Sequence, residues 1–189
     1  RQTTLISSVV AILTALGLTS TALAQDVALT TPREALRFML GTHEEAPPVA
    51  HLEAALVDPI SELRALAEDE AESILFRRRA LIMLGHFDDS RSEGILTELL
   101  RTSPNSDLRR ACAIALERRL GQSDPERLLS LLNPMLSSSD PLDREMAVVL
   151  IARSDARGAR QMLLDHRIIE RHRAVVRVLR TALESDVTH

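Results

Sequence analysis

The sequence predicts an all-α protein built of stacked, antiparallel helix pairs. The first observation is composition, because only 2% of the residues are aromatic, with no Trp and no Tyr, while 45% are hydrophobic. Leu, Ala, Arg and Glu dominate the chain, and these residues favour helices, whereas strands are usually filled by β-branched and aromatic residues. The second observation is an internal repeat in the C-terminal part. A chain of 189 residues is long enough for one modest domain with its own core.

The first 24 residues have the form of a secretory signal. A ten-residue apolar run, Val9–Leu18, follows Arg1 and precedes a short stretch that ends in small residues at Ala24. We expect cleavage before Gln25 and therefore an exported protein, periplasmic or secreted, with no membrane attachment afterwards. The alternative is an uncleaved membrane anchor, but the apolar run is shorter than the roughly 20 residues that a spanning helix needs.

The repeat is a ten-residue template with Arg at its second position, a small residue at its fifth and a large apolar residue at its ninth. It begins at Phe76, Leu108 and Asp143 and, in a looser form, at Glu170. On a helix the fifth and ninth positions lie on one face. The small residue allows a neighbouring helix to approach closely, and the large one fills the groove beside it.

A second, Leu-rich helix follows each of the first three templates. These helices are predicted to begin at an Asp that caps the first turn, and they span Asp89–Leu100, Asp124–Leu136 and Asp155–Leu164. Thr102–Asp107 and Ser137–Asp140 are rich in turn residues and are predicted to be the joints between repeat units. The serines of 137–139 are therefore interpreted as a turn and helix-start signal.

Upstream of the repeats, three further helices are predicted over Pro32–Leu40, Val49–Val57 and Pro59–Asp69. The first of them echoes the template only faintly, as expected of a terminal unit that covers the open end of a stack. The predicted organisation is a signal peptide over 1–24, a linker over 25–31, degenerate N-terminal capping helices over 32–72, repeats over 73–184 and a disordered tail over 185–189.

The template, with its small fifth residue, its Leu-Gly ending and the Leu-rich helix after it, resembles the short HEAT-like repeats of bacterial proteins, a class also found in phycobilisome lyases. The resemblance covers residues 73–184 well and 32–72 poorly, and Arg177 stands where the family prefers Ala. It implies an α-solenoid and, for function, a protein-interaction scaffold. Tetratricopeptide repeats are the alternative fold, but their Trp and Tyr markers are missing from this chain.

The template arginines form the one polar pattern that repeats along the chain. We expect them to form a structural ladder in which interleaved acids neutralise the guanidinium groups through bidentate hydrogen bonds. Solvated arginines and an anion-binding groove are the two alternatives. The arginines are Arg77, Arg109, Arg144 and Arg171, and the expected acids are Asp107, Asp140 and Asp143.

The histidines, the cysteine and the glycines predict no metal, cofactor or catalytic site. His166 with His172, and His43 with His51, are too far apart in sequence to share a helix face at metal-ligand spacing. Cys112 stands at the small, buried template position and is predicted to replace an Ala. The six glycines form no phosphate-binding loop.

The net charge of −4, together with the rarity of aromatic residues, excludes nucleic acid as a default partner. The sequence therefore predicts a non-catalytic exported scaffold that binds a protein or peptide in the bacterial cell envelope. The alternative is a lyase-like or small-ligand-binding protein of the phycobilisome-lyase type. Because the second helix of each unit tends to line the concave side of such stacks, we expect the partner-facing surface to include Arg91, Glu98, Glu126, Arg127, Ser130, Arg157, Arg160 and Gln161.

Overall fold

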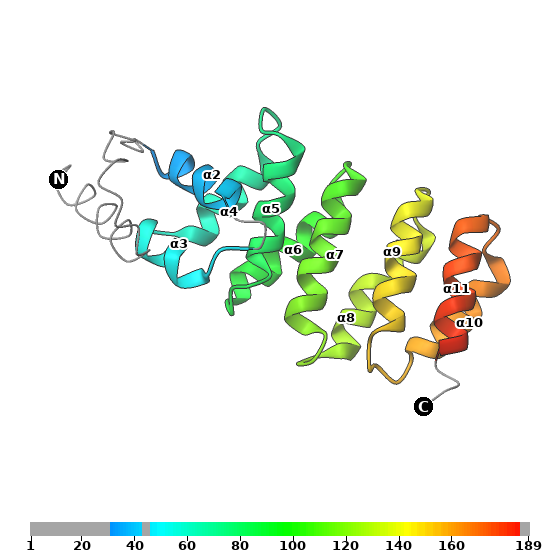
Figure 1. Ribbon diagram of the computed structural model, residues 1–189. Helices are drawn as coiled ribbons and strands as arrows, with labels where there is room; N and C mark the ends of the chain where they lie inside the picture. Colours follow the sequence, from blue (N-terminus) through cyan, green and yellow to red (C-terminus); the bar gives the residue numbers. More distant parts are fainter. Residues whose placement is uncertain (1–30, 43–45, 186–189) are drawn as a thin grey trace. The chain divides into compact units, whose positions relative to one another are not determined.

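The computed structural model describes residues 31–42 and 46–185 (Figure 1). Within these ranges every regular element is a helix, which confirms the all-α prediction. The predicted signal peptide, nearly all of the linker, His43 and residues 186–189 of the predicted tail lie outside the described residues. The helices are α2 (Pro32–Thr42), α3 (Val49–Ala55), α4 (Pro59–Glu68), α5 (Ile74–Leu84), α6 (Ser90–Thr102), α7 (Ser106–Leu120), α8 (Pro125–Leu132), the 3-10 helix η1 (Asn133–Ser137), α9 (Pro141–Ala152), α10 (Ala159–Ile169) and α11 (Arg173–Ser185).

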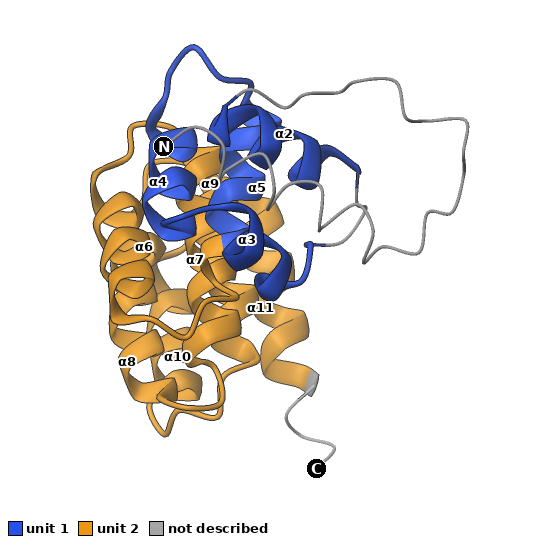
Figure 2. Ribbon diagram, turned by 90° about the vertical axis from the view of Figure 1, so that its left-hand side faces the viewer, with its two compact units in different colours: residues 1–83 blue, residues 84–189 orange. Residues whose placement is uncertain are grey.

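The chain divides into two compact units, residues 1–83 and residues 84–189 (Figure 2). The first unit contains α2 to α4 and nearly all of α5, and the second contains α6 to α11. Each unit has its own fully buried leucines, such as Leu63 in the first and Leu116 in the second. Burial of these side chains provides the main stabilisation of each unit.

In the first unit, arginines of α2 fasten this helix to the turn that follows α4. Arg33 pairs with Asp69, and Arg37 Nε lies 3.0 Å from the Glu72 carboxylate. The Glu72 side chain is only 2% exposed, so its charge needs these partners. Arg79 on α5 donates a hydrogen bond to the carbonyl of Leu40, near the end of α2.

The second unit is a stack of helices in two layers, one made of α6, α8 and α10 and the other of α7, α9 and α11 (Figures 1 and 2). The template explains this packing, because its fifth and ninth positions are fully buried. Cys112 and Leu116 on α7 and Ala147 and Ile151 on α9 are all 0% exposed. Their small-and-large pattern allows neighbouring helices to pack closely, as predicted.

The fourth copy of the template is shifted by one position. Its expected core residues, Ala174 and Val178, are only half-buried, whereas Val175 and Leu179 are 0% exposed. The reason is that α11 packs on α9 and α10 through a single stripe of side chains. Its opposite side is exposed and carries Arg177, at a template position that is buried in the earlier copies.

The packing of α6 differs from the expectation. Helix α6 packs most extensively on α7, whereas α8 packs on both α7 and α9, and α10 packs on both α9 and α11. Thr102–Asp107, predicted to join separate units, therefore connects two closely packed helices, and Ser137–Asp140 connects η1 to α9. In both segments the residue before the following helix, Asn105 or Asp140, has an extended backbone, and its side chain accepts hydrogen bonds from backbone amides of the first turn of that helix.

Several helix ends also need correction. Asp89 and Asp124 cap α6 and α8 as predicted, accepting hydrogen bonds from backbone amides of the first turn. Asp155 does not cap α10, which begins only at Ala159. The predicted helix Asp124–Leu136 changes into the 3-10 helix η1 after Leu132, because Pro134 has no amide hydrogen to continue the α-helical pattern. Helix α11 extends through Ser185, into the predicted tail.

Candidate partner-binding face and the arginine ladder

All eight residues predicted to face a partner are exposed. They lie on α6, on α8, and on α10 with the turn before it, so the structure brings them to one layer of the second unit. We call this surface the α6/α8/α10 face. It comprises Arg91 and Glu98 on α6, Glu126, Arg127 and Ser130 on α8, and Arg157, Arg160 and Gln161 at α10.

Polar contacts connect neighbouring helices across this face. Arg127 Nε on α8 lies 2.7 Å from Glu93 Oε1 on α6. The other oxygen of Glu93 lies 3.4 Å from Arg119 Nε on α7. The backbone N–H of Arg157 donates a 2.8 Å hydrogen bond to Glu126, which links the turn before α10 to α8. These contacts place charged groups of both signs close together on this face.

Other members of the α6/α8/α10 face make contacts within α8, within α10 or with α11. Gln161 Nε2 donates a 2.7 Å hydrogen bond to Asp165, one turn later on α10. Arg160 donates a 3.4 Å hydrogen bond to the carbonyl of Leu183. Ser130 donates one to the carbonyl of Arg127. The face therefore offers a polar surface of mixed charge, which suits binding to another polar protein surface.

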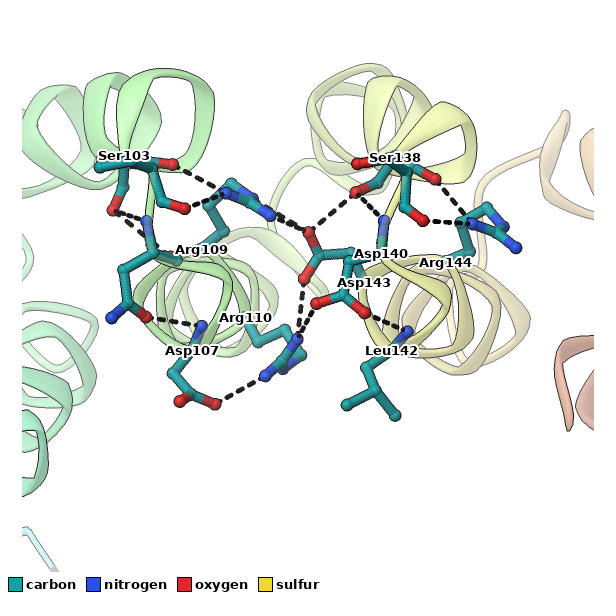
Figure 3. A network of polar contacts seen from close by, with 12 residues as sticks. Ser103, Asp107, Arg109, Arg110, Ser138, Asp140, Leu142, Asp143 and Arg144 are labelled. Carbon is teal, nitrogen blue, oxygen red and sulfur yellow. Dashed lines mark hydrogen bonds and ion pairs between the residues drawn. The ribbon is translucent and has the colours of Figure 1, made fainter.

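In the layer of α7, α9 and α11, the structure shows the predicted ladder at two template arginines, Arg109 and Arg144. Figure 3 shows the polar contacts around them. Arg109 Nη1 donates hydrogen bonds to the carbonyls of Ser103, at 2.9 Å, and Pro104, at 3.1 Å. Its Nε and Nη2 bind Asp143 Oδ2 at 3.0 and 2.5 Å. One guanidinium group thus anchors the turn before its own helix and reaches the next helix of its layer.

Arg144 repeats the same arrangement. Its Nη1 donates to the carbonyls of Ser138, at 2.7 Å, and Ser139, at 3.3 Å. Its Nε and Nη2 bind the two carboxylate oxygens of Glu170, at 2.8 and 3.2 Å. The predicted structural ladder is therefore confirmed for Arg109 and Arg144.

The acids of the ladder differ from those expected. Asp143 serves Arg109 as predicted, but Asp107 and Asp140 contact Arg110, at 2.6 and 3.2 Å. Glu170 was missed. The signal that could have found it is position, since each ladder acid immediately precedes the next template arginine in the sequence.

Arg77 does not bind a carboxylate in this way, and the residue that precedes the next template arginine explains why. The residue before the next template arginine is Leu108, which has no carboxylate to offer. The Nε of Arg77 instead donates a 2.8 Å hydrogen bond to the carbonyl of Ala67, within the first unit.

Asp143 is the most enclosed charge of the ladder. Its side chain is 0% exposed, and besides Arg109 it accepts hydrogen bonds from Arg110 Nη1 and from the Ser138 hydroxyl, both at 3.0 Å. Two cations and a hydroxyl compensate for the loss of water around this carboxylate.

Glu170 binds Arg144 of the ladder and also accepts hydrogen bonds from backbone amides in the turn before α11. The Arg144 guanidinium lowers the pKa of Glu170 from 4.5 to about 2, and hydrogen bonds from the backbone amides of His172 and Arg171 act in the same direction. His166 Nε2 lies 3.1 Å from Glu170 Oε2, and both side chains are nearly buried. The buried His166 therefore belongs to this polar cluster.

The remaining positions that the sequence raised lie in different surroundings. Cys112 is 0% exposed, as predicted, and burial raises the pKa of its thiol to about 12. His172 is exposed. Among residues 31–42 and 46–185, no group of three or more His, Cys, Asp and Glu side chains is placed to hold a metal ion.

Comparison with known protein families finds a similarity over part of the chain. Residues 60–149 match the family model for HEAT repeats. The match starts with α4, earlier than the predicted repeat boundary at residue 73, and it ends within α9. No curated protein and no solved structure matches the chain. No helix in the described part of the chain is long and apolar enough to cross a membrane.

Proposed function

We propose that this protein, whose residues 60–149 form HEAT-like repeats, is a non-catalytic scaffold that binds a protein or peptide through the α6/α8/α10 face. HEAT repeats generally mediate protein–protein interaction. The observation that carries the proposal is the set of eight exposed polar residues on one helix layer, several of them held by contacts between neighbouring helices. A pre-organised surface loses less entropy on binding, which favours recognition of a partner.

The proposal includes export into the bacterial cell envelope. Its support is the sequence alone, namely the apolar run Val9–Leu18 and the small residues that end at Ala24. N-terminal sequencing of the protein recovered from its own cells tests this part. A chain that starts at Gln25 supports export, whereas a membrane-bound chain that retains Val9–Leu18 contradicts it.

A small-ligand-binding role of the phycobilisome-lyase type has less support. Clefts for large planar ligands are usually lined by aromatic side chains, and this chain has three Phe and no Trp or Tyr. Protein binding needs no such cleft, because it uses an exposed surface with charged and polar groups.

The test compares capture of partner proteins by matched variants. One variant neutralises Arg127, Arg157 and Arg160 to Gln on the α6/α8/α10 face. We choose Gln because a carboxylate at residue 127 would face Glu93. We expect this variant to lose partners that the wild-type protein enriches from an envelope fraction, and we expect the enrichment to fall as ionic strength rises.

The matched control neutralises Arg78, Arg118 and Arg153, three exposed arginines outside this face. Arg110 is unsuitable as a control because it bridges Asp107, Asp140 and Asp143. The assignment of the face is wrong if the control loses the enriched partners and the α6/α8/α10 variant retains them. Circular dichroism melting of both variants verifies that they are folded.

A further inference from the structure

Arg171, the fourth template arginine, lies in the turn before α11 and repeats part of this arrangement. Its Nη1 donates hydrogen bonds to the carbonyls of Ile168, at 3.0 Å, in the last turn of α10, and of Glu170, at 3.2 Å. The Nη1 atoms of Arg109 and Arg144 also bind backbone carbonyls, but those of residues five and six positions earlier in the chain. The Nε and Nη2 of Arg171, which bind a carboxylate in both earlier members, have no carboxylate partner within the described ranges.

The side chains around Arg171 are basic and apolar. Arg167, Arg173, Arg177 and Arg180 are exposed, and none of them forms an ion pair with an acid that the structure describes. We call Arg167–Ile169, Arg171 and the exposed side of α11 the C-terminal edge of the second unit. The apolar members of this edge are Ile168, 72% exposed, Ile169, 68% exposed, and Val176, 39% exposed.

The nearby acids do not neutralise this edge. Glu170 is buried, and its carboxylate is already shared by Arg144, His166 and two backbone amides. Asp165 accepts a hydrogen bond from Gln161 on α10. Glu184 lies on the exposed side of α11, and no ion pair within the described residues joins it to the arginines of this edge. Although the net charge of the protein is −4, the described residues therefore place a cluster of arginines without ion pairs at the C-terminal edge.

We propose that the C-terminal edge binds an acidic helical segment of a partner protein, with one carboxylate of that segment on the Nε and Nη2 edge of Arg171. Within this chain the same guanidinium edge binds Asp143 at Arg109 and Glu170 at Arg144; Asp143 lies in the first turn of α9, and Glu170 lies in the turn just before α11. The partner segment takes the place of the next helix of the layer. Its apolar side chains cover Ile168 and Ile169, and its other acids face the arginines of α11.

This surface is distinct from the α6/α8/α10 face, so the two proposals can fail independently. A carboxylate is favoured over a lipid phosphate because both internal copies of the arrangement hold carboxylates. The exposed isoleucines also suit the apolar stripe of an amphipathic helix.

The test uses the full chain and a synthetic amphipathic peptide of three Glu-Ala-Leu-Glu-Ala-Ala-Leu repeats, about 21 residues and long enough to form a helix. A second peptide has Gln in place of every Glu. Fluorescence anisotropy of the labelled peptides measures binding. We expect the acidic peptide to bind about tenfold more tightly than the Gln peptide, as charge-assisted hydrogen bonds to arginine imply.

Protein variants locate the binding. Arg171→Gln is expected to weaken binding of the acidic peptide about tenfold. Because Arg171 also contacts carbonyls of the turn before α11, the double variant R177Q/R180Q provides an independent reduction of charge without touching that turn. Arg101→Gln, an exposed arginine at the end of α6, is the matched control and is expected to bind like wild type.

The proposal is overturned if the Gln peptide binds as tightly as the acidic one, or if neither R171Q nor R177Q/R180Q weakens binding. A second experiment tests a lipid surface as the alternative ligand. It compares binding to vesicles of phosphatidylglycerol and phosphatidylcholine with binding to vesicles of pure phosphatidylcholine. Binding to the anionic vesicles without binding to the acidic peptide would assign the edge to a lipid surface and would also overturn the proposal.

Discussion

Replacement of Glu170 by Gln tests whether the ladder stabilises the fold through charge. Glu170 is 7% exposed, and its ionised form is favoured by Arg144 and by two backbone amides. A pKa lowered from 4.5 to about 2 corresponds to stabilisation of about 3 kcal/mol by the ionised carboxylate. Because Gln keeps part of the hydrogen bonding, we expect E170Q to lower the free energy of unfolding by about 2–3 kcal/mol near neutral pH.

The pH dependence provides the decisive measurement. Since the pKa of Glu170 is depressed in the folded state, its stabilisation is fully present above its ordinary pKa of 4.5 and is lost as the pH falls towards 2. Urea denaturation followed by circular dichroism, repeated at several pH values, gives the free energy of unfolding of both proteins. The difference between wild type and E170Q should shrink steadily over that pH window.

Wild type and E170Q share all other carboxylates. The contribution of those groups therefore cancels when the free energy of unfolding of E170Q is subtracted from that of wild type. Glu184→Gln on the exposed side of α11 is the matched control and should change stability by less than about 0.5 kcal/mol. A wild-type advantage that stays constant from neutral pH down to about pH 3 would refute the electrostatic explanation and leave only a packing role for Glu170.

Three further variants and one chemical reaction test the packing of the second unit. Ala147→Leu should cost about 1–3 kcal/mol, because Ala147 is 0% exposed and a larger side chain overpacks its contact; urea denaturation measures the loss. Gly85→Ala should destabilise similarly, because its Cβ would lie 2.7 Å from the Ala115 carbonyl oxygen and 2.8 Å from its Cα, whereas Gly94→Ala, with no atom within 4 Å, should stabilise α6 by about 0.5–1 kcal/mol. Equal effects of the two glycine variants would contradict this contact. Cys112 should react with a thiol reagent only when the protein unfolds, since it is buried and its thiol pKa is about 12; rapid reaction of the native protein would show that the site opens.

Local patterns were sufficient to predict the helical class, most helices and the residues that fill the core. The small and large template positions Ala147 and Ile151 are buried because side chains four residues apart share a helix face, a relation that the sequence displays directly. The exposure of Arg127 and Arg157 was predictable in the same way, from positions outside the apolar stripe. Export stays a prediction, since residues 1–24 lie outside the described part of the chain.

The polar partners could not be predicted in this way. Arg109 and Asp143 are 34 residues apart, and Arg144 and Glu170 are 26 apart. The alternative acids Asp107 and Asp140 are equally plausible from the sequence, but α7 and α9 bring them to Arg110.

The sequence by itself determined which segments form helices and which side of each helix is apolar, because backbone propensity and side-chain periodicity act over a few residues. Only the tertiary structure decided that α6 packs on α7, that Glu170 completes the ladder and that Arg171 has no carboxylate partner among the described residues. These features depend on how helices dock. Docking sets distances of a few ångströms between charges that lie tens of residues apart along the chain, and the strength of an ion pair depends on that distance and on burial.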